Sequence, residues 1–501
     1  MDILSETTWD VLISGTDIQR SLLSLALSRS KKKILHVDAN PYYGGINAAL
    51  SLEEVDEWAA KHKGLSEAHI GTGNDIFQNA QIQKPSTSDD IARLSPSRSY
   101  NLTLLPFIIH SNSKLLSKLI SSNAYRQLEF QAVGNWWILD SFQGRETLKK
   151  IPNCREDIFQ DSTIDNRSKR NLMKFLRFVI DYKNQPDLWK SFSEKPLNEF
   201  LSAQFSLSVN LQEAIAGLTL TLLAPNLTTV SWALPRIHRH LSSIGVLGSG
   251  FGAVISKWGC GAEICQIACR SGAVGGCVYI LGTGIEKQNQ ANENSELLKI
   301  KLTNGVVIET RHLAAIPDES IKANSLSISR LISISTSTFN NMIKTNTEGG
   351  PMPAVFIVVF PPGSLSDRSE ISNQYPVYLM VHSSDTGECP EGQYVIHATT
   401  VTSEKSKDIL EASLTRLIKD ADNSDGNIIY SFYFEFFPSR EVTSPHFDSI
   451  EQPIDLTFNE HIIDYVEYDW QKVMSCDSES ETFMKFDDRD TTSPNDEEEI
   501  G

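Results

Sequence analysis

Two stretches decide the fold of this chain: Asp10-Val11-Leu12-Ile13-Ser14-Gly15, and after it Leu35-His36-Val37-Asp38. Each contains a short apolar run that predicts a buried strand. The leucine-rich segment Ser21 to Ser28 between them predicts a helix. A strand, a glycine turn, a helix and a second strand in this order form a β-α-β unit, which is typical of dinucleotide-binding domains.

The glycine loop of this unit departs from the pattern that holds a pyrophosphate. A working loop has three glycines, one for the turn, one for close approach to the phosphate and one for helix packing. Gly15 is present, but Asp17 stands at the second glycine position and Arg20 at the third. Asp17 would bring a negative charge to the place of a dianionic pyrophosphate. We therefore expect a scaffold without a bound cofactor, whose function resides on another surface.

Composition excludes several classes of protein. The chain has 501 residues and a net charge of -18, so nucleic acid is not an expected partner. We see no signal peptide and no apolar run of the ~18 residues that a membrane helix needs, and we expect a cytosolic protein. The seven cysteines should remain thiols. Four of them, Cys260, Cys265, Cys269 and Cys277, lack the paired spacing of a zinc site, so no metal is expected.

The apolar pattern divides the chain into four segments. Residues 1–150 are expected to begin an α/β domain I, interrupted by a flexible polar insertion at 64–99. Residues 151–232 read as an inserted all-helical domain II. Residues 233–470 are β-rich and return to domain I, and residues 471–501 read as a disordered acidic tail.

The turn Asn40-Pro41-Tyr42-Tyr43-Gly44-Gly45 follows the second predicted strand. It therefore lies at the carboxyl edge of the sheet, where open α/β folds bind their ligands. Two adjacent tyrosines fit a turn with one buried ring, and they equally fit an exposed aromatic anchor for a partner protein. Spacing alone leaves both interpretations open.

The sequence of the β-α-β unit and of the tyrosine turn resembles that of the superfamily of Rab GDP-dissociation inhibitors and Rab escort proteins. A second block, Trp258-Gly259-Cys260-Gly261 through Val278-Tyr279-Ile280-Leu281, is similar to another stretch of that superfamily. The resemblance implies a multi-sheet, flavoprotein-like fold without flavin and a platform for Rab GTPases. By position, the Rab-binding residues would be Tyr43, Glu263, Arg270, Val278 and Ile280. The block departs from the family at Ala262, an apparent insertion, at Cys277 in place of glycine, and at Ile280, where Met or Cys is common.

A third stretch separates the two branches of the superfamily. Ile151 to Phe159, followed by Lys169-Arg170, is similar to a motif of escort proteins. The resemblance implies that Phe159 and Arg170 bind the α-subunit of Rab geranylgeranyltransferase. By spacing alone, a single phenylalanine at a helix start is more typical of a residue that staples the core.

The resemblance also implies a lipid cargo. A geranylgeranyl chain has about twenty carbons, and at ~0.8 kcal/mol per CH₂ its exposure to water costs on the order of 10 kcal/mol. Helices carrying small residues could part to form an apolar slot, and we assign to it Met173, Leu211, Ala214, Gly217 and Leu218. The same residues would serve equally well as ordinary core.

The sequence favours an escort-type protein without catalytic residues of its own. It would bind unprenylated, GDP-bound Rab, present it to the geranylgeranyltransferase α/β heterodimer and deliver the lipidated Rab to a membrane. Its place would be the cytosol, with transient membrane association and the nucleus as a further compartment. The alternatives are a Rab GDP-dissociation inhibitor that recycles prenylated Rabs, and an FAD-dependent oxidoreductase.

Overall fold

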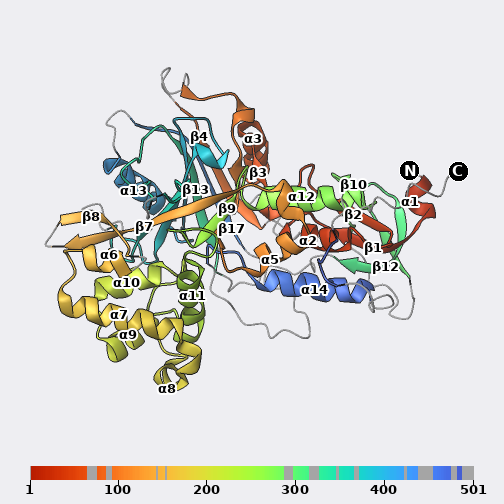
Figure 1. Cartoon of the computed structure of the whole chain (residues 1–501). Helices are drawn as coiled ribbons and strands as arrows, with labels where there is room; N and C mark the ends of the chain where they lie inside the picture. Colours follow the sequence, from red (N-terminus) through yellow and green to blue (C-terminus); the bar gives the residue numbers. More distant parts are fainter. Residues whose placement is uncertain are drawn as a thin grey trace.

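A computed structural model of the chain describes residues 2–64, 76–85, 93–142, 145–152, 155–286, 297–314, 326–345, 349–365, 372–421, 426–437, 455–474 and 482–487. The molecule is elongated and of mixed α/β type (Figure 1). One end carries a small, mostly parallel sheet with its helices, and the other carries a large sheet and a helical bundle. Among the described residues, no helix has both the length and the apolar character needed to cross a bilayer.

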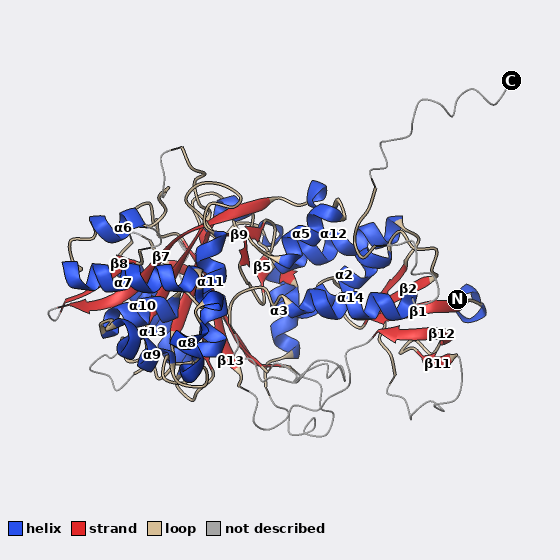
Figure 2. Ribbon diagram, turned by 60° about the horizontal axis from the view of Figure 1, so that its bottom comes forward, coloured by secondary structure: helices blue, strands red, loops and turns tan. Residues whose placement is uncertain are grey.

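The small sheet contains the predicted β-α-β unit. Its strand order is β10 (Val278–Leu281), β2 (Ile34–Asp38), β1 (Thr8–Ser14), β12 (Val307–Ala314) and β11 (Leu298–Lys301). The first four strands are parallel, and β11 pairs antiparallel with β12. Helices α2 (Ile18–Leu27), α12 (Gly261–Val274) and α14 (His461–Met474) pack beside it, with α2 touching both of the others (Figure 2). The predicted fold class is confirmed at this end of the molecule.

The large sheet connects segments from most of the chain. Its order is β4 (Phe77–Gln83), β17 (Ile428–Phe436), β13 (Ile328–Ser335), β16 (Tyr394–Val401), β15 (Val377–Ser383), β14 (Val355–Phe360), β7 (Phe130–Phe142), β9 (Ala253–Ser256) and β6 (Ile109–His110), with β8 (Arg145–Lys150) pairing β7. In β14, alternate residues face opposite sides, as a pleated strand requires. Ile357 joins the core on the side of the helical bundle, whereas Phe356 and Val358 join the core under α13 (Ser406–Lys419). Both faces are covered, so the whole strand is apolar.

Shorter elements complete the part of domain I that precedes the helical bundle. They are α1 (Asp2–Glu6), β3 (Ala49–Leu50), α3 (Leu52–Lys61), β5 (Leu102–Thr103) and α5 (Lys114–Ser121). Helix α3 begins with a capping box in which Ser51 and Glu54 satisfy each other's backbone N–H groups.

The helical bundle comprises α6 (Arg155–Gln160), α7 (Asn166–Ile180), α8 (Pro186–Trp189), α9 (Leu197–Phe205), α10 (Val209–Gly217) and α11 (Val230–Ser243). Its core includes Phe175 and Phe200, both fully buried. The predicted end of domain II at residue 232 is wrong, because α11 continues to Ser243. Pro235 lies inside this helix, in its second turn.

Two further predictions need correction. The segment 64–99, expected to be flexible, contains strand β4, which pairs antiparallel with β17 at the edge of the large sheet. The acidic tail expected from 471 onward begins inside α14, and Phe483 and Met484 are buried in the core beside that helix. Residues 65–75 and 86–92 of the predicted insertion, and 475–481 and 488–501 of the predicted tail, lie outside the described residues.

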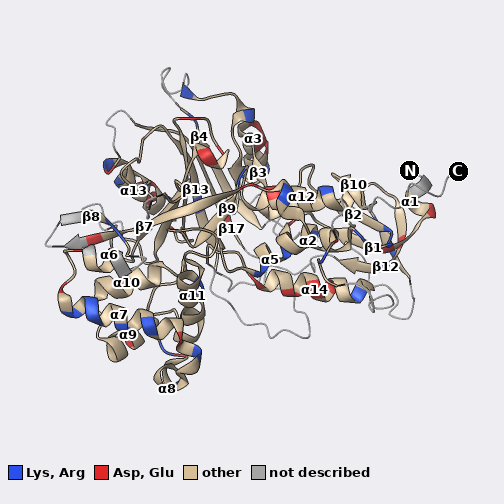
Figure 3. Ribbon diagram, in the orientation of Figure 1, with Lys and Arg blue, Asp and Glu red and all other residues tan. Residues whose placement is uncertain are grey.

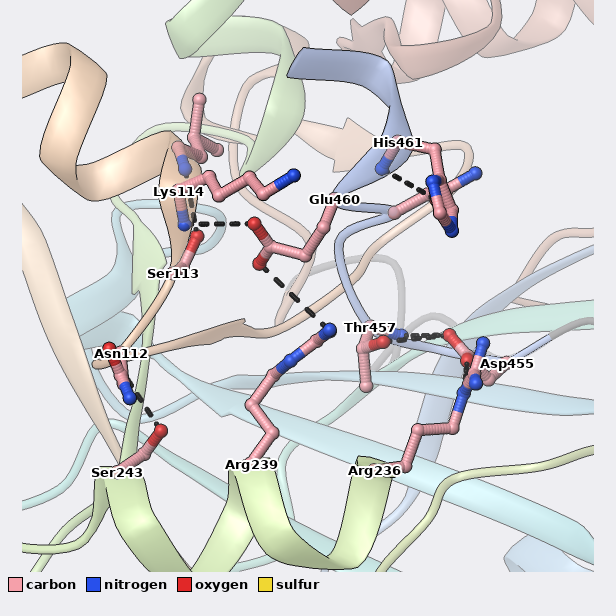
Figure 4. A network of polar contacts seen from close by, with 12 residues as sticks. Asn112, Ser113, Lys114, Arg236, Arg239, Ser243, Asp455, Thr457, Glu460 and His461 are labelled. Atoms are coloured by element: carbon pink, nitrogen blue, oxygen red, sulfur yellow. Dashed lines mark hydrogen bonds and ion pairs between the residues drawn. The ribbon is translucent and has the colours of Figure 1, made fainter. Parts of the chain in front are cut away.

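A polar network ties α11 to one segment that precedes it in the chain and one that follows it (Figure 4). Arg236 Nε lies 2.7 Å from Asp455 Oδ2. The Glu460 carboxylate accepts the backbone N–H of Lys114, at the start of α5, at 2.8 Å and lies 4.0 Å from Arg239. The helical bundle is therefore anchored to the rest of the molecule through its last helix.

Candidate partner-binding surfaces

The glycine loop is filled by the protein's own side chains. Gly15 has a φ of 95°, as the turn requires. Asp17 caps helix α2, and its Oδ1 accepts the backbone N–H groups of Gln19 at 3.0 Å and Arg20 at 3.3 Å. Asn47 Oδ1 accepts the backbone N–H of Ile18 at 3.3 Å. The backbone donors that would hold a pyrophosphate are thus already used.

Asp38 ends the second strand, where dinucleotide-binding domains have an acidic residue that binds a ribose, and here its side chain is engaged internally. Asp38 is buried, and its Oδ2 accepts the backbone N–H of Thr16 at 2.7 Å and the Thr16 hydroxyl at 2.5 Å. Its other oxygen accepts the backbone N–H of Asn40 at 2.8 Å. Arg20, at the third glycine position, is buried and acts electrostatically on Asp469 of α14. These residues do not fit a dinucleotide, which argues against a flavin-dependent oxidoreductase.

The two adjacent tyrosines have different roles. Tyr42 packs against the core of the large sheet, and burial raises its pKa to about 12. Tyr43 is half-buried, and its ring centroid lies 6.0 Å from that of Tyr279 on β10. Both rings are thus partly exposed: Tyr42 packs on the core of the large sheet, and Tyr43 lies beside the edge strand of the small sheet.

Helix α12 shows one face to the core and the other to solvent. Ile264 and Ala268 are buried against α2, whereas Arg270 is exposed and Glu263 is half-buried. The spacing of Glu263 and Arg270 places both on the outer side of the helix. Burial raises the pKa of Glu263, and the nearby charge of Glu129 raises it further.

Strand β10 forms the edge of the small sheet next to this helix (Figure 1). Val278 is 39% exposed, whereas Ile280 is half-buried and packs against the core of the sheet. The structure thus places the five predicted Rab-binding residues on three adjoining elements, the tyrosine turn, α12 and β10. We call this surface, made of Tyr43, Glu263, Arg270, Val278 and Ile280, the α12–β10 platform.

Phe159 and Arg170 line one groove. Phe159, on α6, is 57% exposed, and the neighbouring Ile158 is the residue that enters the core. Arg170 is exposed on α7, and both residues border a cavity of about 730 Å³. Lys169 Nζ donates a hydrogen bond to the Phe159 carbonyl at 3.0 Å. The interpretation of Phe159 as a core staple is therefore wrong.

The five residues assigned to a lipid slot do not share a cavity. Met173 lines the groove of Phe159, Leu211 and Ala214 line a cavity of about 280 Å³ between α10 and β7, and Gly217 lies against Val359 of β14. Leu218 is buried in the core of the large sheet. A common slot would require the helices that carry these five residues to separate.

One buried polar cluster was not foreseen. Glu388 Oε2 lies 2.9 Å from His382 Nδ1 and 3.2 Å from His397 Nε2, and all three side chains are fully buried. Burial lowers the pKa of His397 to about 4, and the positive charge of the buried Arg330 adds to this effect. His382 and Glu388 are close in sequence, but His397 and Arg330 come from other strands. The Arg330 charge disfavours a metal cation here, so we assign the cluster a structural role.

Comparison with known proteins points to the same superfamily as the sequence resemblance. Residues 5–424 match the family model described as GDI, GDP dissociation inhibitor. The chain is 31% identical over 415 residues to the Rab proteins geranylgeranyltransferase component A of Candida albicans, covering 79% of this chain and 60% of that protein. The protein of the same name from Saccharomyces cerevisiae is 31% identical over 396 residues, covering 78% of this chain and 61% of the relative. The chain thus spans about three fifths of the length of these two relatives.

Solved structures share the fold. A Rab GDI from Plasmodium falciparum superposes with a TM-score of 0.62 at 18% identity, covering 93% of this chain and 97% of that one. An oxidoreductase from Methanosarcina mazei superposes with a TM-score of 0.51 at 11% identity, covering 85% and 87%. The second likeness shows that an oxidoreductase shares this fold. With the matched family model spanning most of its length, the chain belongs to the GDP dissociation inhibitor family.

Proposed function

We propose that this chain is an escort-type member of its family. It would bind unprenylated, GDP-bound Rab GTPases, present them to the Rab geranylgeranyltransferase heterodimer and carry the lipidated product to a membrane. The observation that supports this most directly is the pairing of an exposed Phe159 with Arg170 in one groove. The names of the two fungal relatives, component A of the same transferase, point in the same direction.

Binding of the GTPase is assigned to the α12–β10 platform. The guanidinium of Arg270 and the carboxylate of Glu263 can make charge-assisted hydrogen bonds to a partner's backbone and side chains. Val278 and the ring of Tyr43 supply apolar contact area between them and the sheet edge. No step of this binding requires a cofactor, and we propose an accessory role without catalysis.

Transfer of the lipid to this protein is assigned to the helical bundle. Leu211 and Ala214 line a cavity next to the large sheet, and Glu213 beside them has its pKa raised by burial and by the charge of Asp140. An apolar chain entering here would displace water from a partly apolar wall. We propose that separation of α10 from β7 enlarges this cavity when a geranylgeranyl group arrives.

The test is a reconstituted prenylation reaction. It contains the full chain, an unprenylated Rab loaded with GDP, the transferase heterodimer and geranylgeranyl diphosphate. Prenylation should depend on the chain. The Phe159→Ala variant should lose it while still binding Rab, and Arg270→Ala should lose Rab binding. Ile180→Ala is the matched control, since Ile180 is 62% exposed at the end of α7 and outside the groove.

A Rab GDP-dissociation inhibitor is the second candidate, because the P. falciparum Rab GDI shares the fold along nearly the whole chain. Such a protein would extract prenylated Rab from membranes without stimulating the transferase. Extraction combined with no stimulation of prenylation would therefore overturn the escort assignment.

A further inference from the structure

The groove of Phe159 has a charge opposite to that of the whole protein. Its described lining residues include Lys169, Arg170, Lys174 and Arg177 and no carboxylate. The chain as a whole carries a net charge of -18. Figure 3 shows several Lys and Arg residues, in blue, along α7. A local cationic surface on an acidic protein favours an anionic partner.

Three of these four cations come from one side of helix α7. Arg170, Lys174 and Arg177 are spaced by four and three residues, so their side chains lie above one another. Like charges at this spacing destabilise a helix by about 0.2–0.5 kcal/mol per pair. Within the described part of the chain, none of the three has an ion-pair partner. Among the residues that the structure describes, no ion pair offsets their repulsion.

The floor of the groove is apolar. Met173 and Leu188 contribute to it, together with the rings of Phe178 and Phe205. Lys174 Nζ lies 5.9 Å from the centroid of the Phe205 ring. Its charge therefore lies where the apolar floor of the groove meets the cationic residues around it. Phe159 also lines the groove and is 57% exposed. This arrangement fits an apolar side chain flanked by acidic groups better than it fits a purely lipidic ligand.

We infer that the groove recognises an acidic protein surface carrying an apolar side chain, on the transferase of the proposed function, and that Lys174 and Arg177 determine this specificity together with Arg170. Met173 then belongs to the docking floor, not to the lipid slot. The inference rests on the proposed function. Because exposed charges are screened by salt, it requires an affinity that falls as ionic strength rises.

The experiment measures the Kd between the full-length chain and the purified transferase heterodimer at several salt concentrations. The Lys174→Glu/Arg177→Glu double variant should bind at least about 10-fold more weakly at low salt, with a flatter salt dependence. Lys183→Glu/Lys190→Glu is the matched control, since both lysines are exposed in the same bundle and outside the groove. Circular dichroism and Rab binding verify that each variant is folded.

Each outcome has a defined meaning. If the wild type binds transferase and both double variants lose affinity equally, or neither does, the inference is overturned while the proposed function stands. If the wild type binds no transferase at any salt concentration, the proposed function fails and the inference fails with it. Vesicles containing phosphatidylserine give the last comparison: a groove-dependent affinity for them, with unchanged transferase binding, would assign the groove to a membrane instead.

Discussion

The hydroxyl oxygens of Tyr279 and Ser24 lie 2.5 Å apart and join the edge strand β10 to helix α2. Gly272 of α12 faces this contact, and a Cβ at position 272 would clash with both oxygens. Burial raises the pKa of the Tyr279 hydroxyl, so it remains a neutral hydrogen-bonding group. Because Gly272 has no side chain, α12 can approach α2 and β10 behind the α12–β10 platform.

Substitution of Gly272 by alanine should disrupt this contact. Alanine is the better helix former by roughly 0.5–1 kcal/mol, but forcing a methyl group into a packed site costs about 1–3 kcal/mol. We expect a net loss of stability in urea unfolding and weaker binding of Rab, because β10 must move. Gly64→Ala is the control, since a Cβ there meets nothing within 4 Å. An unchanged or higher unfolding midpoint for Gly272→Ala would contradict the argument.

Asp17 should act as a helix cap and not as part of a cofactor site. Asp17→Ala should lower stability by about 1 kcal/mol, because the N–H groups of Gln19 and Arg20 lose their acceptor. Asp17→Asn retains an equivalent acceptor and should be nearly neutral. Calorimetry measures both. Purification of any of these proteins with bound FAD would refute the view that the loop is closed to a dinucleotide.

Stability should decrease as the pH is lowered below neutrality. His240 of α11 is buried, its ring centroid 4.9 Å from that of Trp136, and burial lowers its pKa to about 4. The neighbouring His110 is shifted the same way, mainly by burial. Between pH 6.5 and 4 the unfolded chain binds protons that the folded chain excludes, so folding is disfavoured there.

The size of this pH effect can be checked with one substitution. The shift of His240 predicts a loss of about 2 kcal/mol from pH 7.5 to pH 5. His240→Gln, which cannot titrate, should show a correspondingly shallower pH dependence of the free energy of unfolding, whatever its absolute stability. Equal slopes for wild type and variant would rule out this histidine as the source.

The contact between Arg236 and Asp455 should contribute measurably to anchoring of the helical bundle. The two side chains are 21% and 10% exposed, and Arg236 also stacks 3.7 Å from the Trp232 ring centroid. Because the pair is largely buried, a double-mutant cycle with Arg236→Met and Asp455→Ala should give a coupling of about 1–2 kcal/mol.

An exposed ion pair provides the comparison for this cycle. Lys195 lies just before helix α9 and Glu199 in its first turn, and both side chains are 50% exposed. Their coupling should not exceed about 0.5 kcal/mol. If the two cycles return the same small value, burial does not strengthen the Arg236–Asp455 contact.

Local patterns in the sequence were sufficient to predict the small sheet and a glycine loop that does not hold a dinucleotide. The strands on either side of α2 follow one another along the chain, and Asp17 caps residues only two and three positions ahead. Periodicity also separated the two faces of α12, because helix geometry alone fixes which residues share a face. Recognition of the platform and of Phe159 came from the family resemblance.

Contacts between distant segments were decided only by the tertiary structure. Strand β4 has a weak pattern of its own and is ordered by pairing with β17, which lies far away in the sequence. The anchoring of α11 depends on Asp455 and Glu460, and the proposed lipid residues are distributed among different cavities by packing on β14 and α7. A sequence pattern shows that a side chain will be buried, but its neighbours depend on which elements are brought against it, and that choice is made by the packing of the whole chain.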